Sequence, residues 1–422
     1  MAVVIPLTGF LLERFPIRVV FFAAMGVFAL GTLTAALAPA FEVLLAGRII
    51  QAMGTGVMLP LLFTTVLNVV APERRGRVMG VVTIVIAVAP AVGPTVSGLI
   101  LSTLTWHAIF WLILPIALVA IALGALWVRN VTETRPDARF DIPSVILAAL
   151  GFGGLVFGLS AIGESASGHA PVPVWIPLSI GVVFVVVFIV RQLRLQRKNS
   201  ALLDLRVFES RSFRLAVPLV SIVMASLFGS LILLPIFLQQ SLGLSSLTVG
   251  LMLLPGGVLM GVMAPIVGRL FDRYGPTPLV IPGMTIAAAV LWAMALTFDE
   301  GTPIWWVITV HLALNLGLGL VFTPLMTSAL GSLPRRLYSH GSAVVGTAQQ
   351  VAGAAGTAGF VAIMTVVAST ALSQGADQAG APASGVHAAF LVGAGFATAA
   401  VVLACFVRKP AEVETGGDAA HH

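Results

Sequence analysis

Long apolar stretches alternate with short polar turns along the whole chain. Roughly 20 apolar residues in a helix cross the hydrocarbon core of a bilayer, because each residue rises about 1.5 Å. An apolar stub at 1–12 is too short to cross alone. After this stub we predict twelve full spans, at 18–38, 43–70, 77–101, 107–128, 142–162, 174–193, 213–238, 246–268, 278–297, 303–331, 341–371 and 386–407. The pattern therefore predicts an all-α membrane protein.

The composition supports this prediction and excludes two kinds of machinery. Hydrophobic residues make up 59% of the chain and charged residues 9%, whereas soluble domains carry about 25% charged residues. The sequence has no Gly-x4-Gly-Lys-Ser/Thr loop, which argues against an ATP-driven motor. It also has no Cys/His cluster of the kind that binds a metal. We therefore expect no enzyme, no metal site and no bound cofactor.

The basic residues predict the orientation. Of the 22 Lys and Arg residues, 21 fall on alternate connections between spans, and the opposite connections carry none. Basic loops stay in the cytoplasm, so this Arg-rich side and the tail at 408–422 are predicted to be cytoplasmic, in a multi-pass protein of the cell inner (plasma) membrane. The basic segment at 191–214 is expected to lie against anionic headgroups. Arg48 is the exception, because it lies inside a span.

An internal repeat divides the chain into two halves. GFLLERFP (9–16) and GRLFDRYG (268–275) share the pattern Gly-x-Leu-x-acid-Arg-aromatic. The Gly-x-Gly pairs at 54–56 and 317–319 also correspond, which places Arg48 opposite His311. Parallel repeats of this kind are typical of transporters. We predict bundles at 1–129 and 213–407, separated by two linker spans and a basic segment at 130–212.

The repeat also predicts a missing span. The second half has a complete span, at 213–238, before the helix that leads to Gly268, whereas eight residues precede Gly9. The parent design therefore has roughly 50 more residues upstream, enough for one span and a loop.

Several motifs resemble those of the major facilitator superfamily. GFLLERFPIR resembles its signature turn, with Glu13 in place of Asp and Pro16 in place of Gly, and the second copy keeps Asp272, Arg273 and Gly275. RIIQAMGTG resembles its Arg-x-x-Gln-Gly-x-Gly motif, and APAVGPTVSG (89–98) its antiporter motif. The stretches at 106–115 and 199–213, with the two unpaired spans, resemble the fourteen-span drug:proton antiporters of the EmrB/QacA type.

This resemblance implies a function. Proteins of this branch export hydrophobic or cationic small molecules, including antibiotics, by alternating access between two bundles. The energy source would be the proton gradient, and the partners would be the substrate, protons and the bilayer, with no nucleic acid and with a single chain as the working unit. An importer on the same fold and a truncated membrane protein without transport activity are the alternatives. No motif predicts the substrate's identity.

The two signature turns are predicted to gate the cytoplasmic side. A carboxylate at a helix end pairs with Arg and caps neighbouring helix N-termini, so the cluster can hold one conformation closed. The alternative is a plain topogenic turn. The predicted gating residues are Gly9, Glu13, Arg14, Arg18, Gly268, Asp272, Arg273 and Gly275.

Intramembrane polar residues are candidates for proton coupling and for the cavity wall. Arg48 is costly at membrane depth and is expected to face the bundle interior, with Gln51 one turn on. His311 titrates near neutral pH and fits either a proton relay or a packing role. The amides of Asn315, Gln349 and Gln350 either line a cavity or bridge helices.

Pro90, Gly93, Pro94 and Gly98 form the predicted antiport helix. Proline kinks a helix, and glycine lets another backbone approach closely. The resemblance implies that this stretch favours exchange over symport. Ordinary packing of small residues is the alternative.

All sixteen acidic residues lie in loops, at span ends or in the tail. Proton-coupled transporters usually carry an acid within the membrane. The resemblance places that acid in the first span, the part that this chain lacks.

Overall fold

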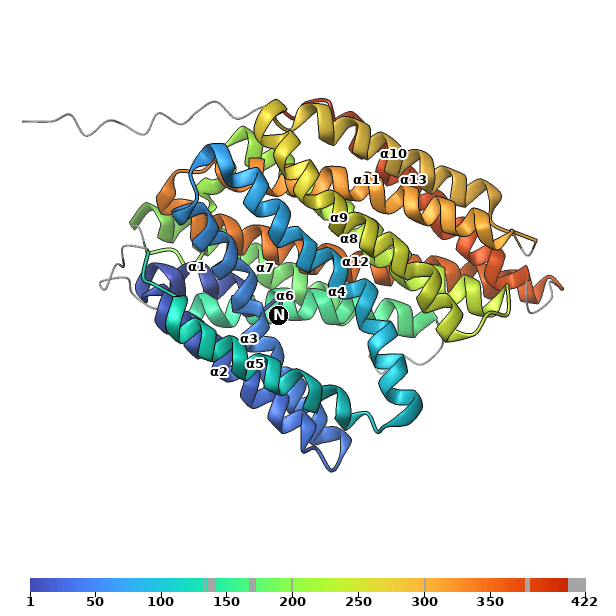
Figure 1. Cartoon of the computed structure of the whole chain (residues 1–422), viewed down its shortest axis with the longest axis horizontal. Helices are drawn as coiled ribbons and strands as arrows, with labels where there is room; N and C mark the ends of the chain where they lie inside the picture. The colour runs from blue at the N-terminus through green and yellow to red at the C-terminus, as the bar shows by residue number, and fades with distance from the viewer. Residues whose placement is uncertain are drawn as a thin grey trace, which may run out of the picture.

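The computed structural model describes residues 1–131, 134, 141–166, 172–198, 200–299, 301–375 and 380–408. Every regular element in these ranges is a helix, and the long ones lie in a layered bundle (Figure 1). The α-helices are α1 (Ile5–Arg14), α2 (Ile17–Ala36), α3 (Phe41–Val69), α4 (Arg75–Thr103), α5 (His107–Trp127), α6 (Ile142–Ala166), α7 (Trp175–Leu195), α8 (Arg211–Gln240), α9 (Ser246–Tyr274), α10 (Thr277–Thr297), α11 (Ile304–Gly331), α12 (Tyr338–Ser373) and α13 (Gly380–Ala404).

The predicted spans correspond in order to α2–α13, which confirms the all-α membrane fold. Judged on the residues that the structure describes, eleven of these helices, all except α4, are long and apolar enough to cross a membrane. The largest differences are six residues: α9 ends at Tyr274 rather than at residue 268, because the helix continues through the charged turn, and α13 begins at Gly380 rather than at residue 386. Small residues open this helix, and their weak hydropathy hid its start.

Local chemistry fixes the helix ends that matter for function. The Ser210 hydroxyl accepts the Phe213 N–H at the start of α8, and the Ser245 hydroxyl does the same for Thr248 in α9. Gly275 ends α9 with φ of +77°, a left-handed conformation that favours glycine. The turn after Asp272 and Arg273 is therefore set by the backbone of Gly275.

The repeat appears in the helix packing. Helix α2 packs against α3 and α5, and α10 packs in the same way against α11 and α13. Across the two halves α4 runs along α9, and α1 packs against α12 (Figure 1). Each half thus contributes one helix to each of two equivalent contacts, as expected for parallel repeats.

The linker helices α6 and α7 form a close pair beside α12. A Cβ added to Gly154 would lie 3.0 Å from the backbone nitrogen of Gly181, so glycine permits this approach. At the Arg-rich end, Arg191 forms a two-pronged ion pair with Asp141, with N–O distances of 2.7 and 2.8 Å. The hydrogen bond from Arg191 holds the pKa of Asp141 below its ordinary value.

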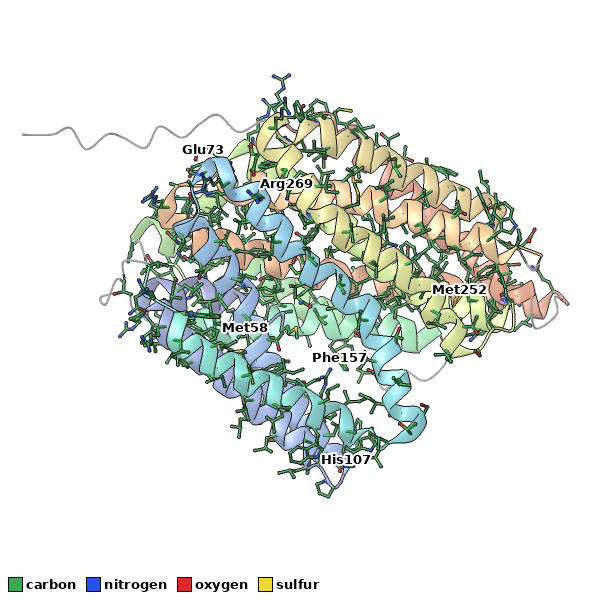
Figure 2. All side chains as sticks on the ribbon, viewed as in Figure 1. Met58, Glu73, His107, Phe157, Met252 and Arg269 are labelled. Atoms are coloured by element: carbon green, nitrogen blue, oxygen red, sulfur yellow. The ribbon has the colours of Figure 1, made fainter. Side chains whose placement is uncertain are left out.

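The halves meet closely on the Arg-rich side and diverge toward the other. Figure 2 shows Glu73 and Arg269 near the end where α4 meets α9, whereas His107 and Met252 lie well apart at the opposite end.

Candidate functional site

Asp272 joins the end of α9 to the start of α4. Its Oδ1 accepts the Gly76 N–H at 2.7 Å, and its Oδ2 accepts the Arg77 N–H at 2.8 Å. These two N–H groups belong to the first turn of α4, which has no intrahelical partners for them, and the helix dipole favours a negative charge there. The predicted capping of a neighbouring helix by Asp272 is confirmed.

Glycines bring the same two helices into backbone contact. A Cβ on Gly268 would lie 2.2 Å from the carbonyl oxygen of Gly76, and a Cβ on Gly76 would lie 2.5 Å from that of Gly268. Nearby, Arg273 places its guanidinium carbon 5.2 Å from the centroid of the Tyr274 ring. Gly268 is thus a contact point between the halves.

The first signature turn makes the equivalent contact through a residue that the sequence did not single out. The Glu13 Oε2 lies 3.3 Å from Nε2 of His340, which begins α12 and is 3% exposed. A Cβ on Gly9 would lie 2.8 Å from Nδ1 of the same ring. His340 stands in the third position of α12, as Arg77 stands in α4, an equivalence that the helix starts in the structure reveal and the sequence did not.

Arg14 and Arg18 differ in what they contact. Arg18 donates from Nη2 to the Ala125 carbonyl at 3.0 Å, and its N–H donates to the Asn130 side chain, so it ties α2 to the end of α5 within one half. The guanidinium of Arg14 lies 5.8 Å from the centroid of the Phe15 ring.

A buried arginine also crosses between the halves. Arg75, 7% exposed, donates from Nη2 to the Leu67 carbonyl at 2.9 Å and to the Tyr338 hydroxyl at 3.0 Å. Its guanidinium also lies over the Tyr338 ring. The sequence had assigned Arg75 only to the orientation signal.

Two buried pairs of hydroxyl groups extend this closure. Thr64 Oγ1 and Ser342 Oγ are 2.9 Å apart, and Thr323 donates to Thr83 at 3.0 Å. Together with Glu13, His340, Arg75, Tyr338 and Asp272, these side chains form what we call the Arg-rich gate.

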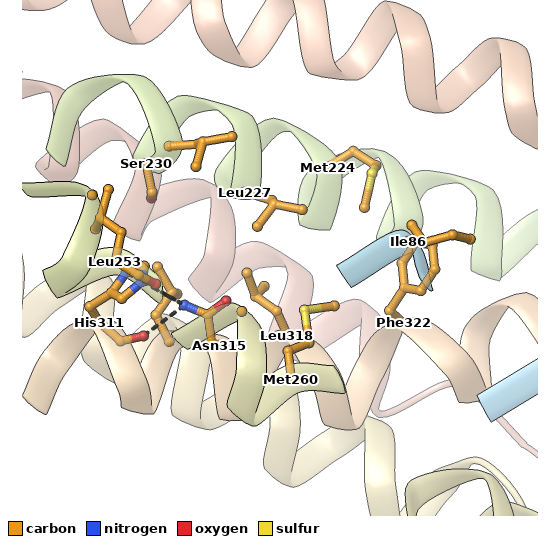
Figure 3. A pocket seen from close by; sticks show the side chains of 14 residues that line it. Ile86, Met224, Leu227, Ser230, Leu253, Met260, His311, Asn315, Leu318 and Phe322 are labelled. Atoms are coloured by element: carbon orange, nitrogen blue, oxygen red, sulfur yellow. Dashed lines mark hydrogen bonds between the residues drawn. The ribbon is translucent and has the colours of Figure 1, made fainter. Parts of the chain in front are cut away.

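Two adjacent cavities lie beyond the gate. The larger measures about 760 Å³, and Gln349, Gln350 and Phe228 are part of its wall. The smaller measures about 80 Å³ and holds His311, Asn315 and Ser230 (Figure 3). The walls of both include the same four apolar side chains, Ile86, Met224, Leu227 and Phe322. Apolar walls with a few polar groups are typical of small-molecule sites.

The polar groups of the smaller cavity are only partly satisfied. His311 Nε2 lies 3.2 Å from the Leu253 carbonyl oxygen, and Asn315 Nδ2 donates to the His311 carbonyl at 2.9 Å (Figure 3). Ser230 Oγ is buried and has no hydrogen-bond partner in the described structure. His311 is the one titratable side chain that the described walls of these two cavities contain.

The Arg48 network lies elsewhere. Arg48 donates to Gln51 Oε1 at 2.7 Å, and Gln51 donates to Thr32 at 2.9 Å. Arg48 is exposed, and the described walls of the two cavities do not include it. Ala52, one turn further along α3, is part of the wall of the larger cavity, so Arg48 shares the helix face that borders this cavity, and its role in coupling stays a prediction. Gln51 is buried and links α3 to α2 through Thr32.

In this structure no other helix passes close to the glycines of the predicted antiport helix, whose role stays a prediction. A Cβ on Gly93 or Gly98 would meet nothing within 4 Å. The close approach of α4 to α9 lies further toward the Arg-rich side, at Gly76 and Gly80. Pro90 and Pro94 lie within α4, but their side chains are outside the described residues.

No group of three His, Cys, Asp or Glu side chains that could hold a metal occurs within the described ranges. The chemistry that the site offers is therefore reversible hydrogen bonding at the gate and apolar binding in the cavities.

Comparisons with known proteins agree with this architecture. Residues 1–357 match the family model of the Major Facilitator Superfamily. The lincomycin resistance protein LmrB of Bacillus subtilis is 42% identical over 364 residues, covering 86% of this chain and 75% of LmrB. Its counterpart in Listeria monocytogenes is also 42% identical, covering 97% of this chain and 86% of the relative. The multidrug resistance protein B homolog of Mycobacterium tuberculosis is 32% identical, and the match covers 86% of this chain and 67% of the relative.

Two solved structures share the fold. The human organic anion transporter MFSD10 (TETRAN) superposes with a TM-score of 0.66 at 17% identity, covering 96% of this chain and 80% of that one. The proton:xylose symporter XylE superposes with a TM-score of 0.62 at 15% identity, covering 97% of this chain and 84% of the symporter. The helical bundle, the repeat and the family match lead to one conclusion: this chain is a multi-pass membrane transporter of the major facilitator superfamily.

Proposed function

We propose that the chain exports hydrophobic or cationic small molecules, antibiotics included, across the bacterial plasma membrane in exchange for protons. The observation that carries this proposal is the apolar cavity between two halves that are joined on one side only. The relatives named for lincomycin and multidrug resistance support it, since they cover most of the chain.

The cavity wall suits varied apolar substrates. Met224 adapts its shape to different partners, and Phe228 and Phe322 offer aromatic faces to a lipophilic cation. The amides of Gln349 and Gln350 add hydrogen bonding without a net charge. Such a wall binds by apolar contact and tolerates differences in substrate shape.

The proposal includes the direction of opening. We take the Arg-rich side, with the C-terminal tail, as cytoplasmic, so the gate is closed toward the cytoplasm. Export then requires the Arg-rich gate to open for loading and to close again before release to the outside. The gate residues would act by holding the closed state rather than by contacting the substrate.

The proposal also places the chain in the fourteen-span drug:proton antiporter branch. Two features support this placement: the linker pair α6 and α7, and α8, which has no counterpart in the first half. A complete repeat would then place one helix before α1. The bundles at 1–129 and 213–407 would move against each other within a single chain, with Pro90, Gly93, Pro94 and Gly98 in the antiport helix.

We assign part of the proton coupling to His311, with an acid in the helix before α1 as the other carrier. His311→Gln keeps a similar size and polarity but cannot be protonated near neutral pH. We expect binding of a fluorescent lipophilic cation to stay within about twofold, and gradient-driven accumulation in everted vesicles to fall at least about tenfold, the effect of losing about 1.4 kcal/mol of coupling.

His387→Gln is the matched control, because His387 lies on α13 in the wall of a different hollow. Accumulation that remains gradient-driven in His311→Gln, at the level of the control, would show that His311 carries no coupling proton.

A further inference from the structure

The segment that joins α7 to α8, residues 200–209, does not lie on the surface. Leu202 and Val207 are 1% and 0% exposed, and both belong to the main hydrophobic core with Leu203. Its apolar residues anchor it beneath the gate, while basic residues on either side of it, among them Arg197 and Arg211, remain exposed, so the predicted contact of 191–214 with lipid headgroups stays a prediction.

Two backbone groups of the linker segment bind side chains on either side of it. The Leu203 N–H donates to Oε1 of Gln192 on α7 at 3.2 Å, and the Asp204 N–H donates to Nδ1 of His340 on α12 at 3.3 Å. Gln192 is fully buried and donates from Nε2 to Ser144 on α6 at 2.7 Å. Hydrogen bonds therefore run without a break from the linker helices to the gate.

The bond from Asp204 fixes the state of the His340 ring. Because Nδ1 accepts an N–H, it carries a lone pair, and the ring hydrogen is on Nε2, which faces Glu13. The ring can hold Glu13 in this orientation only while the linker segment stays in place. A free ring would rotate or change its tautomer.

Charged groups of three elements surround this ring in a small polar pocket of about 70 Å³. They are Glu13 of α1, Asp204 and Arg206 of the linker segment, and Arg336 of the short helix η4 (Arg335–Leu337). Arg206 pairs with Asp204 at 2.6 Å. Burial alone raises the pKa of Asp204, but hydrogen bonds from the side chain and backbone of Arg206 hold that pKa below its ordinary value. Asp204 therefore stays ionised and keeps its place beside η3 (Leu205–Glu209).

The repeat shows what is special about this half of the gate. Asp272 caps α4 directly through two backbone N–H groups. In the equivalent contact between α1 and α12, the His340 ring stands between Glu13 and the linker segment. At this point of the contact between α1 and α12, one side chain therefore bonds to a part of the chain that belongs to neither half.

We propose that the linker segment is the lock of the Arg-rich gate: it orients His340 so that His340 holds Glu13, and the pair α6 and α7 anchors the lock through Gln192. His340 is then a positioning residue for gating. This inference rests on the proposed export function only where it concerns the effect of the lock on transport. Closure of the gate itself can be measured without substrate.

Accessibility of a buried reporter tests the lock. The full chain carries Cys405→Ser to remove its one native cysteine and Ser342→Cys as the reporter, since Ser342 is fully buried within the gate. A membrane-impermeant maleimide is added to the exposed Arg-rich face of everted vesicles, and the labelling rate is measured. A parallel chain that keeps Cys405, which is exposed after α13, reports general changes in reactivity.

Two pairs of variants separate the lock from ordinary packing. Asp204→Pro removes the N–H that His340 accepts, at a φ of −80° that proline tolerates, whereas Asp204→Asn keeps this N–H. His340→Leu removes both ring contacts, whereas the amide of His340→Gln can both accept and donate. We expect Asp204→Pro and His340→Leu to raise the labelling rate about tenfold and their partners to change it less than about twofold.

Equal labelling within each pair, whether slow or fast, would overturn the proposal. Slow labelling throughout means that the gate closes without the lock, and fast labelling throughout means that the region matters only as packing. If the export function is wrong, these labelling rates stay the same. That failure would appear in a different experiment, because the unsubstituted chain would then accumulate no drug.

Discussion

Gly268→Val is expected to reduce export by more than about tenfold. The first side-chain atom would lie 2.2 Å from the Gly76 carbonyl oxygen, 2.8 Å from its carbon and 3.2 Å from the Arg77 Cα. All three are backbone atoms, so α9 has to move away from α4, and Asp272 then loses both N–H partners. Overpacking of this kind costs about 1–3 kcal/mol, and tenfold corresponds to about 1.4 kcal/mol, so we expect drug accumulation in everted vesicles to fall by more than about tenfold.

Gly250→Ala provides the control on the same helix. A Cβ at Gly250 would meet Thr95 Oγ1 at 3.6 Å, an ordinary contact distance. We expect this variant to retain export within about twofold at equal membrane levels. If Gly268→Val also retained more than half of the activity, the contact between α4 and α9 would not be needed for gating.

Asp272→Asn is expected to have the second largest effect. The asparagine oxygen can accept one of the two α4 N–H groups, but its NH₂ group then faces the other donor. An unsatisfied buried donor costs about 1–3 kcal/mol, and the lost charge at the helix N-terminus adds about 0.3–1 kcal/mol. We therefore expect at least a tenfold fall in export, with faster maleimide labelling of Ser342→Cys from the Arg-rich side.

Asp299→Asn is the matched control, since Asp299 accepts the Gly301 N–H at the opposite end of the molecule, between α10 and α11. It should leave both labelling and export within about twofold. If Ser342→Cys were labelled as slowly in Asp272→Asn as in this control, the result would contradict the role of Asp272 in closing the gate.

The sequence predicted the parts of this account that depend on repetition. The spacing of apolar stretches located α2–α13, because span length can be read from a run of neighbouring residues. The two copies of the signature turn singled out Gly268 and Asp272 as gating candidates, and the structure places both where α9 meets α4. Electrostatics at a helix end also act locally, so a short motif was enough to find these residues.

The other gate residues depend on which helices cross, which the sequence did not show. Arg75 fitted the orientation signal, and an arginine at that helix end looks the same whether it contacts lipid headgroups or Tyr338. A single histidine, His340, has no periodicity, and its partners Glu13 and Asp204 are far away in the chain. The same reason applies to Gly93 and Gly98, which contact no other helix in this structure: a glycine indicates close packing only where another helix passes.

We propose that this chain exports drugs against a gradient by opening and closing the Arg-rich gate. The most direct measurement is accumulation of a fluorescent lipophilic cation, and of lincomycin in parallel, by energised everted vesicles that contain the full chain. We predict accumulation that a protonophore abolishes and that Asp272→Asn lacks. Accumulation no greater than in vesicles without the protein, or uptake of the same compounds by intact cells, would contradict the claim.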